Sequence, residues 1–212
     1  MPLEVRVEAI SEPVPLVDML EGIYSRNGET RFEFVAYVPG SEYDFTSIVA
    51  TETFDMNRVR QIGLENLARE LLGRVYVEHD EIESMLGRIA VGLTSRIRGG
   101  HLPQIDFSCS KDREDEVYEL TKSFGIDGYV LCSGRSYHFQ GSEGIDENVW
   151  KSFVKGLSDY HDIVDMDWAE ECGENGYSVL RITDARPRQQ IPMVVARVRK
   201  LPKYEGQLEL PF

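Results

Sequence analysis

The pattern of apolar and polar positions predicts short strands and amphipathic helices in the first hundred residues. Apolar residues alternate with polar ones over 4–10 and 31–38, which is typical of strands, and a further extended segment is expected over 45–54. Apolar residues at helical spacing predict helices over 16–24, 57–72 and 81–97. Gly99 and Gly100 then end the last helix, so a joint between two halves of the chain is expected there.

The second half of the chain predicts alternating strands and helices followed by an irregular tail. The expected elements are a strand over 104–109, a helix over 113–124, strands over 129–132 and 137–140, a helix over 147–160, a short helix near Trp168, and strands over 178–183 and 193–198. This order predicts an α+β fold with helices packed on a largely antiparallel or mixed sheet. The expected division is an amino-terminal α/β half (1–100), a second half (101–200) and a flexible tail (201–212).

The composition indicates a globular protein and limits the partners that it is expected to bind. The chain has 212 residues, 42% of them hydrophobic, and a formal net charge of −14, which argues against a protein that coats nucleic acid non-specifically. No apolar run is long enough to span a bilayer, so we expect a soluble, cytoplasmic protein. The segment 181–203, however, contains seven Lys and Arg and a single acid, Asp184. This basic segment is either a weak binding surface for DNA or RNA or a pair of solvated strand faces.

Cysteine and histidine usage gives no sign of a structural metal site. Three cysteines, Cys109, Cys132 and Cys172, are widely spaced in apolar surroundings, which predicts reduced, buried thiols. His79, His101 and His161 lack metal-ligand spacing, and we expect them at the surface.

The segment 128–140 concentrates the candidate chemistry. An apolar strand runs into the turn at Ser133 and Gly134, and a second strand follows, in which Tyr137 and Phe139 should point to one face and His138 to the other. Hydroxyl, guanidinium and imidazole groups at such a turn can donate hydrogen bonds to a triphosphate. The alternative is an ordinary hairpin with a surface histidine.

The order of motifs from Asp106 onward resembles the archaeo-eukaryotic primase superfamily, which includes the primase-polymerases. The residues that carry the resemblance are Asp106, the run Ser133-Gly134-Arg135-Ser136-Tyr137-His138, the pair Asp165 and Asp167, and Leu180-Arg181-Ile182. The resemblance covers about the last half of the chain. It implies a nucleotidyltransferase of DNA replication or repair that takes a nucleoside triphosphate and uses Mg²⁺ or Mn²⁺.

The same resemblance implies roles for single residues. Asp106 and one of Asp165 and Asp167 would be the catalytic, metal-binding acids. The nucleotide would be bound by residues of the turn and of the strand that follows the third motif: Ser133, Arg135, Ser136, His138 and Arg181.

One position departs from the family pattern. The first motif usually carries two acids with one residue between them, and here the second position is Ser108. Because Mg²⁺ prefers charged oxygen ligands, a hydroxyl does not replace the missing carboxylate, although Asp112 lies nearby in sequence. We therefore expect impaired catalysis, and the alternative is a non-catalytic protein of the same fold that binds a nucleotide or nucleic acid.

The last six residues resemble a bacterial sliding-clamp-binding peptide. Gln207, Leu208, Leu210 and Phe212 match its pattern of a glutamine followed by spaced apolar residues. An extended peptide of this kind places its apolar side chains in a preformed pocket of the partner. The resemblance implies recruitment by a sliding clamp and a bacterial source, and the alternative is a tail packed on its own domain.

Overall fold

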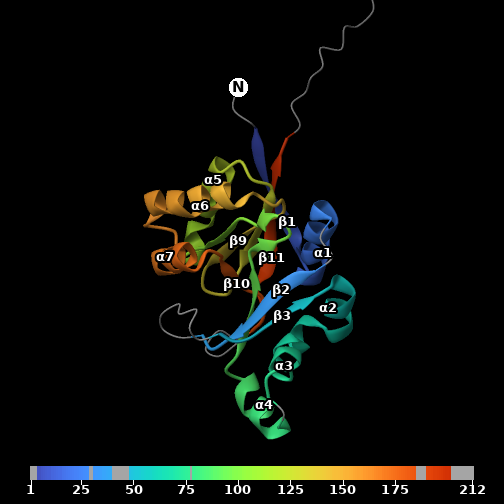
Figure 1. Ribbon diagram of the computed structural model, residues 1–212. Helices are drawn as coiled ribbons and strands as arrows, with labels where there is room; N and C mark the ends of the chain where they lie inside the picture. The colour runs from blue at the N-terminus through green and yellow to red at the C-terminus, as the bar shows by residue number, and fades with distance from the viewer. Residues whose placement is uncertain (1–3, 29–30, 40–47, 77, 185–189, 202–212) are drawn as a thin grey trace, which may run out of the picture.

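The computed structural model describes residues 4–28, 31–39, 48–76, 78–184 and 190–201, and these form an α+β fold (Figure 1). A five-stranded sheet has the order β1-β11-β8-β9-β7, and a four-stranded sheet has the order β10-β4-β2-β3. Among the described residues, every strand pairing in the two sheets is antiparallel, where the sequence predicts a largely antiparallel or mixed sheet. The strands are β1 (Val5–Val14), β2 (Phe32–Tyr37), β3 (Ile48–Phe54), β4 (Ala90–Thr94), β7 (Gln104–Asp106), β8 (Gly128–Cys132), β9 (Tyr137–Gly141), β10 (Val179–Arg181) and β11 (Met193–Lys200), with a small ribbon of β5 (Arg96–Ile97) and β6 (Gly100–His101).

Three of the helices begin at an aspartate that caps the first turn. Asp55, Asp146 and Asp165 each accept a hydrogen bond from a backbone N–H in the first turn of the helix that follows. The helices are α1 (Leu16–Asn27), α2 (Met56–Ile62), α3 (Leu67–Leu72), α4 (His79–Leu86), α5 (Glu114–Ser123), α6 (Glu147–Gly156) and α7 (Met166–Asn175), with short 3₁₀ turns at η2 (Leu64–Asn66), η3 (Lys111–Arg113) and η4 (Leu157–Tyr160).

Two of the expected helices are wrong in extent. The helix over 57–72 is broken into α2 and α3 because Gly63 adopts a positive φ of 77°, which an α-helix cannot contain. The helix over 81–97 stops at Leu86, and the residues after it form β4, the fully buried strand next to β2.

Each of the two sheets contains strands from both sides of residue 100. Strand β1 pairs with β11 in the five-stranded sheet, whereas β10 pairs with β4 in the four-stranded sheet. Neither sheet is therefore confined to one of the two expected halves.

The five-stranded sheet is covered on both faces, and β8 shows how the core is divided. Tyr129 and Leu131 pack into a cluster with α1 and the four-stranded sheet, while Val130 packs into a second cluster with α5, α6 and α7. In Figure 1, α1 lies on one side of β11 and α5, α6 and α7 lie on the other. Trp168 is fully buried in the second cluster.

None of the helices among the described residues is both long and apolar enough to cross a bilayer. The three cysteines are free thiols, and Cys109 and Cys172 are buried.

Candidate active site

Asp106 and His138 face each other across neighbouring strands. Strand β7 ends at Asp106, which lies opposite His138 in the antiparallel pairing of β7 with β9. Both side chains are buried, and His138 Nε2 lies 3.4 Å from Asp106 Oδ1. Tyr137 and Phe139, on either side of His138, pack together in the cluster beneath α5–α7. The alternation of strand β9 thus directs the imidazole to the acid.

Asp165 lies beside Asp106 because the chain returns to the end of β7 after α6. Phe107 pairs with Val164 in an isolated antiparallel bridge, and Asp165 N donates to Asp106 O at 3.0 Å. Asp167 lies in the first turn of α7, exposed and outside the pocket described below. Of the two candidates for the third motif, the structure brings Asp165 to Asp106.

The turn between β8 and β9 closes over the segment that follows Asp106. Ser133 N donates to Ser136 O at 2.9 Å. The Ser136 hydroxyl donates to Phe107 O at 2.5 Å and accepts from Cys109 N at 3.2 Å. These bonds hold the turn 133–136 against residues 107–109.

Together these segments enclose a pocket of about 290 Å³. Its lining residues are Asp106, Phe107, Ser108, Cys109, Ser133, Arg135, Ser136 and Asp165. Arg135 brings an exposed guanidinium to this pocket, opposite in charge to the two carboxylates. The two carboxylates of the pocket suit a bound metal cation. Its guanidinium and hydroxyl groups suit phosphate oxygens.

His138 and Arg181 are placed differently from the turn residues. Neither lines the pocket, since His138 lies against Asp106 and Arg181 lies behind the turn. The buried Arg181 guanidinium donates to the backbone carbonyls of Ser133 and Gln190 at 2.7 and 2.8 Å, and also to that of Thr183.

The acid missing from the first motif is not replaced by Asp112. Asp112 lies exposed in η3 and outside the pocket, and a hydrogen bond from the Ser110 side chain lowers the pKa of its carboxyl. Among the described residues, no three His, Cys, Asp or Glu side chains are grouped so as to hold a metal ion. The donor set nevertheless fits a single Mg²⁺ or Mn²⁺, because such ions are held by one or two carboxylates completed by water and substrate phosphates.

Sequence reasoning missed Phe107 and Cys109 as walls of the pocket. Burial raises the pKa of the Cys109 thiol above its ordinary value, so the group is neutral and forms an apolar wall. The strand expected over 104–109 ends at Asp106, so a strand pattern alone does not place the residues that follow it at a pocket.

His101 corrects the expectation of a surface side chain. It is 4% exposed and stacks on Trp150 with ring centroids 4.4 Å apart. Its Nδ1 lies 3.0 Å from Ser95 Oγ, and its Nε2 lies 2.8 Å from Glu147 Oε2. These contacts tie α6 to the end of β4. His79 and His161 are exposed, as expected.

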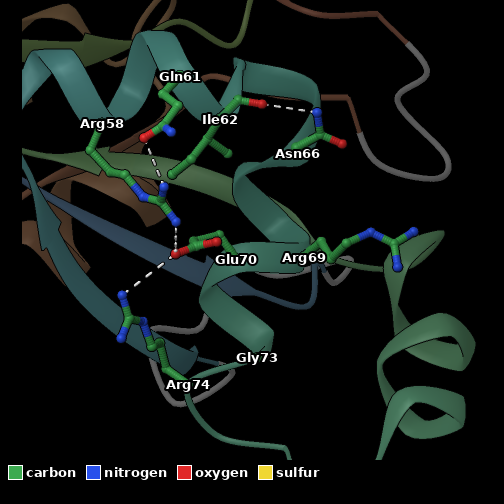
Figure 2. A pocket seen from close by; sticks show the side chains of 8 residues that line it. All are labelled: Arg58, Gln61, Ile62, Asn66, Arg69, Glu70, Gly73 and Arg74. Carbon is green, nitrogen blue, oxygen red and sulfur yellow. Dashed lines mark hydrogen bonds and ion pairs between the residues drawn. The ribbon is translucent and has the colours of Figure 1, made fainter.

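A second pocket, of about 680 Å³, lies on α2 and α3. Figure 2 shows Arg58 and Arg74 pointing toward Glu70, whereas Arg69 points away from it. Arg58 Nη2 and Arg74 Nη2 lie 2.7 and 3.5 Å from Glu70 Oε1, and Arg69 pairs with Glu83. Because each guanidinium is already compensated by a carboxylate, we place the candidate site at the first pocket.

Several sequence expectations fall outside the described residues. These are the clamp-peptide residues Gln207, Leu208, Leu210 and Phe212, and three cations of the basic segment, Arg186, Arg188 and Lys203.

Comparison with known proteins bears on the family and the fold. A family model described as archaeo-eukaryotic primase 1D-like matches residues 74–193, which is more than half of the chain. A search of curated proteins gives no match. Among solved structures, the chain is similar to the catalytic domain of primase Repb′, determined in complex with initiator DNA, with a TM-score of 0.52 and 13% identity over 85% of this chain and 84% of that one. The structural similarity concerns the fold, and the family match contains the acids, the turn and Arg181. The chain therefore belongs to the archaeo-eukaryotic primase 1D-like family.

Proposed function

We propose that the pocket binds a nucleoside triphosphate with one divalent cation, and that the chain is a primase-polymerase-like nucleotidyltransferase domain of weak catalytic power. The observation that carries the proposal is the pairing of Asp106 with Asp165 next to the turn 133–136, in one pocket. The expected setting is DNA replication or repair.

In this proposal, some residues of the pocket bind the cation and others bind the phosphates. Asp106 and Asp165 would hold the Mg²⁺ or Mn²⁺, which when bound neutralises phosphate charge and favours ionisation of an attacking hydroxyl. The Arg135 guanidinium donates to the phosphate oxygens, and the Ser133 hydroxyl is a further donor in the same wall. His138, buried against Asp106, keeps that carboxylate oriented.

Catalysis is weak in this proposal because the donor set suits one cation rather than two. Two-metal transfer places two ions about 3.5–4 Å apart and needs carboxylates that bridge them. Ser108 brings a neutral hydroxyl to the pocket where the family motif has an acid.

The same observation favours a second candidate function. A pocket with two carboxylates, an arginine and several hydroxyls can bind a nucleotide without transferring it. In that case the chain is a non-catalytic nucleotide- or nucleic-acid-binding protein of primase fold.

An extension assay combined with a binding measurement separates the two functions. We expect a nucleoside triphosphate to bind in the presence of Mn²⁺, and Asp106→Asn to abolish that binding. Slow primer synthesis or extension, lost in Asp106→Asn, supports the enzyme. Triphosphate binding without any product supports the binding protein. No triphosphate binding by the parent chain refutes the enzyme and the nucleotide-binding form of the second function.

DNA contact is proposed from the basic residues of β11. Arg197, Arg199 and Lys200 lie on this strand, and Arg199 and Lys200 are near carboxylates at 3.9 and 3.5 Å. These pairings leave little excess charge, so DNA binding should be weak, and because few phosphates are neutralised its decline with salt should be shallow.

A further inference from the structure

Arg181 joins the two sheets directly behind the pocket wall. It ends β10 in the four-stranded sheet, and its guanidinium is buried, with 4% of the residue exposed. One of its nitrogens donates to the carbonyl of Ser133, the first residue after β8 in the other sheet. Another donates to the carbonyls of Thr183 and Gln190. The guanidinium thus fixes three backbone positions at once.

The segments that Arg181 holds are those that shape the turn 133–136. Gly134 has a φ of +104°, and the Gln190 side chain lies against it, with Oε1 3.4 Å from where a Cβ would stand. Ser133, Arg135 and Ser136 line the pocket. Arg181 therefore binds the backbone of the turn at Ser133 and the backbone of Gln190, whose side chain packs against the turn.

We infer that Arg181 is a positioning residue for the phosphate-binding turn, acting through the carbonyls of Ser133 and Gln190, in place of the direct triphosphate contact that the family resemblance implies. The planar guanidinium can reach several carbonyls in fixed directions, whereas a lysine ammonium is a compact point charge on a flexible stem. A lysine at this position should keep the charge and lose the geometry. The inference rests on the proposed function where its test measures nucleotide binding.

The test compares Arg181→Lys with the parent chain in binding nucleoside mono-, di- and triphosphates with Mn²⁺. If Arg181 positions the turn, all three affinities should fall by the same factor, about 10-fold, as is typical when a supporting residue is removed. Arg135→Ala serves as the contrast, because loss of a direct contact should grow with the number of phosphates. A loss in Arg181→Lys that also grows with phosphate number, or no loss at all, overturns the inference.

Amide hydrogen exchange over residues 133–136 provides a readout that needs no nucleotide. Exchange in this turn should be at least several-fold faster in Arg181→Lys than in the parent, while exchange in α5 stays unchanged. If the parent binds no nucleotide, the proposed function fails, and the exchange comparison alone decides whether Arg181 holds the turn. Unchanged exchange at the turn contradicts the inference.

A second variant keeps the test decisive if Arg181→Lys does not fold. Arg181→Gln keeps a side-chain amide at this position but cannot reach the carbonyls of Ser133, Thr183 and Gln190 together, as the guanidinium does. It should lower the three affinities by one common factor and speed amide exchange over residues 133–136. Equal binding and equal exchange in Arg181→Gln and the parent would overturn the inference.

Discussion

In the proposed function, Ser108 is the residue that limits the level of activity. It lines the pocket with Asp106 and Asp165 and is exposed there, so a carboxylate placed at this position would meet solvent and a cation rather than a packed core. We predict that Ser108→Asp raises Mn²⁺-dependent primer extension by about 10-fold or more, because it completes the acids needed for a second cation.

Extension rates of the purified variants check this prediction. Ser152→Asp is the matched control, since it adds the same charge at an exposed serine of α6 outside the pocket. A rise in both variants, or in neither, contradicts the role given to position 108.

In the proposed function, Arg135 would supply the positive charge that faces the phosphates. A hydrogen bond between charged partners contributes about 1.5–3 kcal/mol, so Arg135→Ala should weaken triphosphate binding by roughly 10- to 100-fold. Titration calorimetry measures the change. Arg88→Ala removes an exposed arginine outside the pocket and should bind like the parent. Equal loss in both variants would mean that only the overall charge matters.

At the level of single residues, several of the residues singled out from the sequence line one pocket, while their roles stay predictions. Asp106, Ser133, Arg135 and Ser136 line it, and the spacing of Ser136 and His138 matches their contacts with the segment 106–109. The choice between Asp165 and Asp167 could not be made from sequence. It depends on the bridge between Phe107 and Val164, which joins residues far apart in the chain.

Among the elements, the turn 133–136 combines backbone strain with the candidate chemistry. Gly134 has a φ of +104°, a conformation that a side chain rarely adopts, so Gly134→Ala should cost on the order of 1–3 kcal/mol or move the turn. We expect Gly134→Ala to lose triphosphate affinity, while its unfolding temperature falls by only a few degrees.

Thermal unfolding and nucleotide titration on the same sample check the glycine prediction. Gly156→Ala is a suitable control, because no atom stands within 4 Å of its Cβ position. Unchanged triphosphate affinity in Gly134→Ala would show that the turn does not contact the nucleotide.

The errors in element prediction have a physical cause. Ile89, Val91 and Leu93 alternate as in a strand, while Ile89, Leu93 and Ile97 also fit the spacing of a helix. The segment forms a strand because it pairs with β2 and β10. These partners are distant in the chain, so the local sequence pattern does not reveal them. The strands 129–132 and 137–140, bounded by clear turn residues, were predicted to within one residue.

For the molecule as a whole, the net charge of −14 makes recruitment by a partner more plausible than tight DNA binding by the chain itself. We propose that the carboxy-terminal peptide binds a bacterial sliding clamp through Leu208, Leu210 and Phe212. Burying an apolar side chain of this size contributes about 1.5–3 kcal/mol, which is consistent with micromolar affinity after ordering costs.

Titration of a clamp with the full chain and with a Leu210→Ala, Phe212→Ala double variant checks the peptide. The parent should bind, and the double variant should lose most of the affinity. Glu209→Ala is the control, because its side chain is expected to face solvent and should matter little. No binding by the parent, or equal binding by the double variant, rejects the clamp as a partner.

The central claim is that the pocket between Asp106, Asp165 and the turn 133–136 holds one cation and a nucleoside triphosphate. A crystal structure of the chain with Mn²⁺ and a non-hydrolysable triphosphate, with the ion located by its anomalous signal, tests it most directly. The account predicts a single Mn²⁺ bound by Asp106 and Asp165, with phosphate oxygens at Arg135. Two ions in this pocket, or a triphosphate bound elsewhere, would contradict it.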